Sequence, residues 1–64
     1  MKFYAELYPL FAGRSRYVRP DGTTSAFRVT YESKVAMQRA VRKFRKGEES
    51  GLLMSYQLFE DKCR

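Results

Sequence analysis

Residues 33–47 read SKVAMQRAVRKFRKG, and this stretch decides the fold class. Ser33 is a residue type that caps helix N-termini, and Gly47 stands where helices commonly end. Between them, apolar residues recur at i, i+3, i+4 and i+7, which is the spacing of one helix face. These residues are Met37, Ala40, Val41 and Phe44. The pattern predicts a helix over 34–46 that buries this face.

The residues before the helix carry strand patterns. Residues 2–8 alternate, with Phe3, Ala5 and Leu7 on one side, which predicts a half-buried strand. Residues 14–19 are short, aromatic and β-branched and form a candidate second strand. Residues 26–31 alternate again and predict a third strand. The Pro20-Asp21-Gly22 tripeptide between them is a turn signal, so we expect a hairpin over 14–31 with a loop of about five or six residues.

After the helix, residues 48–51 read as a polar loop, residues 52–59 as a final strand, and the residues from Glu60 onward as a charged tail. The expected order is β-β-β-α-β. The fold class is therefore α+β: a small antiparallel sheet of three to four strands with one helix packed on one face, in a single domain over 1–64.

One helix covers only one face of such a sheet, so the two faces are expected to differ. Tyr17 is predicted to point inward. The predicted inner face further holds Phe3, Leu7, Phe27, Val29, Met54, Tyr56 and Leu58. The predicted outer face holds Tyr4, Tyr8, Arg28, Thr30, Leu53, Gln57 and Phe59, joined by Arg14 and Arg16.

Tyrosine and arginine on the outer face suggest a second binding surface made of Tyr4, Tyr8, Arg14, Arg16 and Arg28. Such residues stack on nucleic-acid bases, and they are also enriched at protein–protein hot spots. The structural alternative is that a single-layer sheet leaves some aromatic side chains half exposed.

The positive charge is concentrated in the helix. The chain has a formal net charge of +6, with 13 basic and 7 acidic residues. The predicted helix contains no acid and six bases, so the other seven bases balance the seven acids. The six bases are Lys34, Arg39, Arg42, Lys43, Arg45 and Lys46. An all-basic helix face predicts a surface for nucleic-acid phosphates or for an acidic protein patch; a merely solvated face is the alternative.

Catalytic and metal-binding patterns are missing from the sequence. Histidine is absent, the lone cysteine is Cys63, and there is neither a phosphate-binding loop nor a dinucleotide fingerprint. We therefore expect no catalytic residues, no metal, no cofactor and no enzyme activity. There is no 18-residue apolar run, and Glu6 interrupts the N-terminal segment. These features predict a cytoplasmic protein without a membrane partner.

The layout resembles small bacteriophage accessory proteins of the host-takeover-inhibitor and anti-CRISPR type. The similar features are the chain length, the strand that begins at Lys2, and the strand that runs through Phe27 to Tyr31 into the helix. Met1 is expected to begin a complete small gene product. The chain is also similar in layout to the sheet-plus-helix DNA-binding domains of phage integrases, where the sheet enters the major groove. Arg14, Arg16, Arg19 and Arg28 would suit that use.

These observations predict a non-enzymatic binding protein of phage type that docks its basic helix on a host nucleic-acid-processing protein or nucleoprotein complex and blocks it. A direct DNA- or RNA-binding module is the first alternative. A structural, oligomer-forming accessory protein that uses the open sheet face is the second. The expected partner is an acidic protein surface or nucleic acid, and the chain itself is expected to be a monomer or a weak homodimer.

Overall fold

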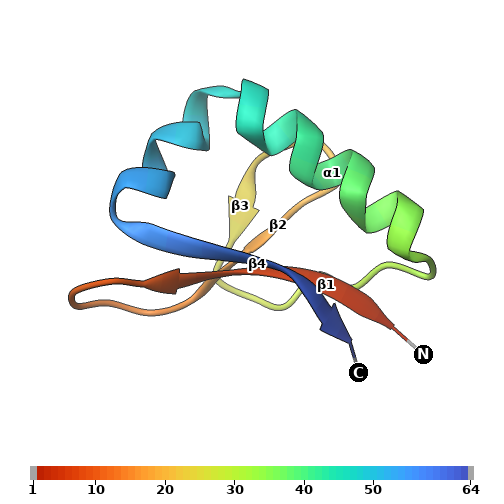
Figure 1. The fold of residues 1–64 in the computed structure, drawn as a ribbon, viewed down its shortest axis with the longest axis horizontal. Helices are drawn as coiled ribbons and strands as arrows, with labels where there is room; N and C mark the ends of the chain where they lie inside the picture. The colour runs from red at the N-terminus through yellow and green to blue at the C-terminus, as the bar shows by residue number, and fades with distance from the viewer. Residues whose placement is uncertain (1, 64) are drawn as a thin grey trace.

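The computed structural model describes residues 2–63, apart from the side chain of Asp61. The elements follow in the order β1 (Phe3–Pro9), β2 (Arg16–Val18), β3 (Thr24–Ser25), α1 (Lys34–Lys46), the 3-10 helix η1 (Glu48–Met54) and β4 (Tyr56–Cys63). All strands pair antiparallel in one sheet of order β3-β2-β1-β4, and α1 lies across one face of it (Figure 1). The predicted α+β class and single-helix layer are confirmed.

The third strand is shorter than predicted and lies earlier in the chain. The turn after β2 closes within residues 19–23, where Arg19 N–H donates to the Thr23 carbonyl at 2.8 Å and Gly22 N–H donates to the Arg19 carbonyl at 3.0 Å. This places Thr24 opposite Val18. The chain then bends, because the Ser25 hydroxyl accepts the Phe27 N–H at 3.1 Å. The predicted strand over 26–31 is therefore wrong.

Residues 26–31 instead run to the open flank of β1. Phe3 and Tyr31 exchange two backbone hydrogen bonds of 2.9 and 2.7 Å and form an isolated bridge. This bridge fills the side of β1 that the short β2 leaves unpaired. Because the segment contacts the sheet at its end rather than along its length, Phe27 is 82% exposed and not in the core as predicted. Val29 does pack against the core.

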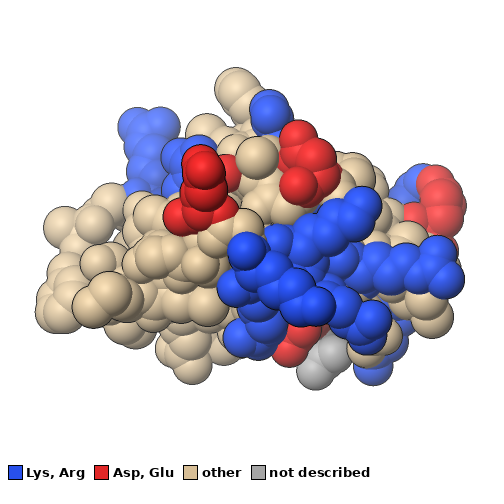
Figure 2. Space-filling model, turned by 90° about the horizontal axis from the view of Figure 1, so that it is seen from above, with Lys and Arg blue, Asp and Glu red and all other residues tan. Residues whose placement is uncertain are grey.

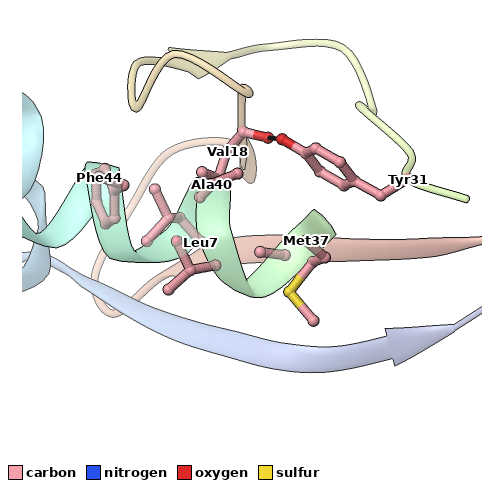
Figure 3. Close-up of a cluster of buried hydrophobic side chains, with 8 residues drawn as sticks. Leu7, Val18, Tyr31, Met37, Ala40 and Phe44 are labelled. Atoms are coloured by element: carbon pink, nitrogen blue, oxygen red, sulfur yellow. Dashed lines mark hydrogen bonds between the residues drawn. The ribbon is translucent and has the colours of Figure 1, made fainter. Parts of the chain in front are cut away.

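The core lies between α1 and the inner face of the sheet (Figure 3). All four residues of the predicted helical stripe are buried, which confirms the helix face. Tyr31 closes one end of the core, and its hydroxyl donates to the Val18 carbonyl at 2.7 Å. The buried apolar residues are Ala5, Leu7, Val18, Tyr31, Met37, Ala40, Val41 and Phe44.

The ends of α1 match the prediction. The Ser33 hydroxyl accepts the Ala36 N–H at 3.1 Å, which satisfies one of the unpaired amides of the first turn. Gly47 ends the helix with φ −90°, so the left-handed conformation of many C-terminal glycines is not used here. A Cβ at Gly47 would lie 3.2 Å from the Lys43 carbonyl oxygen. Glycine therefore suits this position because it lets the backbone pass close to that oxygen.

The segment after α1 differs from the predicted loop and strand. Glu48–Met54 forms η1, because the Glu49 carboxylate reaches β3 and accepts the Thr24 N–H at 2.9 Å and the Thr24 hydroxyl at 3.2 Å. Within η1, Leu53 packs toward the core although the alternation predicted the outer face. Met54 was predicted inward and is 85% exposed. The strand β4 begins at Tyr56 and takes in the predicted tail, with a register shift opposite Tyr4 to Glu6.

Candidate anion-binding surface

Four cations of α1 form one stripe on the side of the helix that faces away from the sheet. With about 100° per residue, Arg39, Arg42, Lys43 and Lys46 fall within an arc of roughly 100° whose centre is about 160° from that of the buried face. The stripe extends over roughly 10 Å of helix axis at about 1.5 Å per residue. We call these four residues the basic stripe. Figure 2 shows the resulting blue surface over α1.

The basic stripe is exposed and unneutralised. All four residues are exposed. Within residues 2–63 none of them makes a side-chain hydrogen bond or an ion pair. An ordinary exposed helix mixes the two signs of charge, and i,i+4 pairs of opposite sign stabilise it. Here the four cations face solvent and have no partner among the described residues, so their charges are available to an external anion.

The other two predicted cations of the helix lie outside this stripe. Arg45 donates to the Glu60 carboxylate of β4 at 3.5 Å and so ties the helix to the edge of the sheet. Lys34 lies at the first position of α1, where it is exposed, and it is also engaged in an interaction. The predicted site of six residues therefore divides into four that face solvent together and two at its margins.

The turn between β2 and β3 supports the C-terminal half of the stripe from below. Gly22 is buried and has φ +89°, a backbone conformation that suits glycine. A Cβ there would lie 3.0 Å from the Lys43 carbonyl carbon. The turn therefore packs directly on the helix backbone beneath Lys43. Together with the buried Phe44, this contact gives the stripe a fixed platform.

The outer sheet face is organised differently from the prediction. Tyr17 lies opposite Glu6 and beside Tyr4, with 6.0 Å between the two tyrosine ring centroids, so Tyr17 points outward. The Arg28 guanidinium lies 4.6 Å from the centroid of the Tyr4 ring and 5.9 Å from that of Tyr17. This cation is thus held over aromatic rings. On the same face the Glu6 carboxylate lies 3.9 Å from the Lys62 ammonium, so these two opposite charges offset each other.

The two remaining arginines of the predicted second surface are not brought into it. Arg16 lies opposite the buried Leu7, hence on the helix side, and its Nε donates to the Thr24 hydroxyl at 2.8 Å. The prediction that Arg16 points outward is wrong because the register of β2 is one residue away from the expected one. Arg14 lies in the connection before β2, and Tyr8 is 56% exposed near the end of β1.

Sequence reasoning missed an uncharged end of the molecule. Leu10, Phe11 and Met54 expose 52%, 87% and 85% of their surface. The Leu10 N–H donates to the Ser55 carbonyl at 3.0 Å, which brings the chain at Leu10 and Phe11 to the same end of the molecule as Met54. With Tyr8 we call them the apolar tip. A sequence signal existed: residues 7–13 and 50–59 hold no charged residue. Its meaning depends on β1 pairing with β4.

The structure contains neither a pocket nor a metal-binding cluster among residues 2–63. Cys63 is exposed as a free thiol. No helix in this part of the chain has the length and apolar character needed to cross a bilayer. Comparison of the chain with protein-family models, with curated proteins and with solved structures finds no match. The candidate functional features of residues 2–63 are therefore their exposed surfaces.

Proposed function

We propose that this chain is a non-enzymatic binding protein that docks the basic stripe on a polyanionic surface of a nucleic-acid-processing protein or nucleoprotein complex and blocks access to it. The observation that carries the proposal is the group of four exposed cations on α1 that have no partner within residues 2–63. The resemblance in layout to small phage inhibitors points to the same class of partner.

The stripe lowers the stability of the free protein, which supports a binding role. Its members make four like-charge pairs at i,i+3 or i,i+4, and each such pair destabilises a helix by about 0.2–0.5 kcal/mol. The sum is roughly 1–2 kcal/mol, a sizeable fraction of the stability of a domain with 64 residues. An anionic partner would convert this repulsion into attraction and form charge-assisted hydrogen bonds with the same groups.

The test is a charge reversal with a matched control. The double variant Arg42→Glu, Lys46→Glu changes the net charge by −4 and should abolish capture of the partner from a host lysate. The control Lys2→Glu, Arg14→Glu makes the same change in net charge outside α1. It also removes the exposed Lys2–Glu32 ion pair, which contributes little to stability because both groups are solvated, and it should retain capture. The free energy of unfolding of both variants should lie within about 1 kcal/mol of the parent value, because all four replaced side chains are exposed. A stripe variant that captures its partner as well as the parent does would disprove the proposal.

Direct binding of nucleic acid is the second candidate, and the same unpaired cations favour it. If the four residues contact four phosphates, the plot of log affinity against log salt should have a slope near −3.6, which is roughly a 150-fold loss of affinity between 50 and 200 mM salt. An acidic protein patch would instead show its salt dependence mainly in the association rate. Nuclease treatment of the lysate separates the two cases, because it removes capture only where nucleic acid is the contact.

A further inference from the structure

The apolar tip is built from two uncharged segments that are distant in sequence. All 20 charged residues lie outside residues 7–13 and 50–59. The β1–β4 ladder brings these segments together through the pairs Leu7 with Leu58, Tyr8 with Gln57, and Pro9 with Tyr56. The loop after β1 and the end of η1 lie at the same end of the molecule in Figure 1, and the far left of Figure 2 is tan, with a blue group beside it at the upper left.

The side chains of the tip are exposed on an ordered framework. Phe11 and Met54 are each more than 80% exposed, and Tyr8 and Leu10 are each more than half exposed. The Leu10 to Ser55 backbone hydrogen bond ties the loop to the start of β4. A single exposed apolar residue such as Phe27 is ordinary, whereas four that the β1–β4 pairing brings to one end of the molecule mark a candidate interaction surface.

We propose that the apolar tip is the contact surface of a homodimer in which two copies of this chain meet tip to tip. The charge distribution favours the tip as the place where two copies meet. Two molecules of charge +6 repel each other, and at the tip the four contacting side chains are uncharged. The tip also carries no charged group that would have to be desolvated or paired across a two-fold axis.

The exposed area is sufficient for a weak dimer. With about 200 Å² per large side chain, the exposed fractions of the four tip residues amount to roughly 500–600 Å² for each copy. The total of about 1,000 Å² lies at the lower limit for specific interfaces. An interface of this size is typical of weak, transient association, so the dimer should dissociate readily and not be obligate.

This interface is independent of the proposed function, since it uses none of the residues of the basic stripe. It differs from the sheet-face association expected from the sequence. If the stripe does bind a polyanion, the dimer presents two stripes on one particle, and the second docking event becomes intramolecular.

Sedimentation equilibrium of the purified protein under reducing conditions, which prevent a disulfide through Cys63, tests the dimer. The parent should show a monomer–dimer equilibrium at micromolar concentration. Phe11→Asp and Met54→Asp should each weaken the dimer by at least tenfold, whereas Phe27→Asp, at an equally exposed site away from the tip, should not. Circular dichroism should show all three variants folded, because each replaced side chain is more than 80% exposed.

Salt distinguishes this contact from the charged one. Raising the ionic strength from about 0.01 to 0.15 M shortens the Debye length from about 30 to 8 Å. For two +6 protomers whose centres are about one long axis, 30 Å, apart, this should tighten the dimer by roughly tenfold. Docking on a polyanion weakens under the same change. A parent that stays monomeric throughout this concentration range, or that dimerises equally well with Phe11→Asp, overturns the proposal and leaves the stripe test unaffected.

Discussion

Replacement of Gly22 by alanine is the sharpest test of the contact that supports the basic stripe. The new Cβ would meet three atoms of Lys43 at 3.0–3.1 Å, and two of these belong to the backbone carbonyl of α1. That carbonyl cannot move aside without shifting the turn of helix that holds the buried Phe44. The backbone at Gly22 has φ +89°, so alanine is strained there regardless of space.

The two effects can be estimated separately. A non-glycine residue held at positive φ costs about 1–3 kcal/mol, and an overpacked contact costs about 1–3 kcal/mol more. The central value of the sum, about 4 kcal/mol, lowers the melting temperature of a domain of this size by roughly 16–32 °C. The whole domain has a free energy of unfolding of only about 3–10 kcal/mol. A large fraction of the variant molecules should therefore be unfolded at moderate temperature.

Two other glycines separate the two causes in thermal denaturation followed by circular dichroism. Gly13 has φ +130°, but a Cβ there would meet no atom nearer than 3.8 Å. Gly13→Ala should therefore lose only the stability that backbone strain costs, without the overpacking cost. Gly51 has neither a positive φ nor an atom within 4 Å, so Gly51→Ala should melt within a few degrees of the parent. If Gly22→Ala is no less stable than Gly13→Ala, the turn does not press on Lys43 and this account of the platform is wrong.

Three further predictions follow from the core and the outer face. Phe44→Ala should cost about 3–5 kcal/mol in chemical denaturation, because Phe44 is fully buried between α1 and the sheet; a loss below 1 kcal/mol would contradict that packing. Burial raises the pKa of Tyr31 to about 12, with the Asp21 carboxylate acting in the same direction. The folded state therefore holds this proton more tightly than the unfolded chain, whose tyrosine pKa is about 10, so the stability is complete below pH 10 and is lost as the pH rises toward 12. Stability measured against pH should fall in that window for the parent and less for Tyr31→Phe; an equal fall in both would assign the loss to other groups. Arg28→Ala should lose no more than about 1 kcal/mol, the value of an exposed cation–π contact, while Tyr4→Ala and Arg28→Ala should weaken partner binding if the outer face takes part in it; unchanged affinity in both variants would restrict binding to α1.

The helix and the first strand were predictable from sequence because their signals are local. The buried face of α1, its Ser33 cap and its end at Lys46 follow from residue spacing and from side-chain chemistry within a few positions. The alternation of β1 likewise placed Ala5 and Leu7 in the core. The concentration of all the excess charge in one helix follows from the order of residues in the chain, so the candidate surface could be located before its geometry was known.

The elements that were mispredicted depend on contacts between residues far apart in the chain. Glu49 holds Thr24 across 25 positions, and this pairing converts a predicted loop and strand into η1 and moves the start of β4 to Tyr56. Tyr31 pairs with Phe3 across the flank of β1, which draws residues 26–30 out of the ladder and leaves Phe27 in solvent. The alternating patterns at 26–31 and 52–59 were present in sequence, but alternation alone specifies neither a partner strand nor a register.

The sequence by itself determined which residue types the protein could use: six cations on a helix without acids, a single cysteine and no histidine. The tertiary structure alone decided which of them act together. It divided the six helical cations into the basic stripe, the Arg45 pair with Glu60, and Lys34 at the first position of α1. It also turned Arg16 to the helix side and joined two uncharged segments into the apolar tip. The physical reason is that a surface is formed by residues that are neighbours in space, and β-pairing creates neighbours that no local pattern encodes.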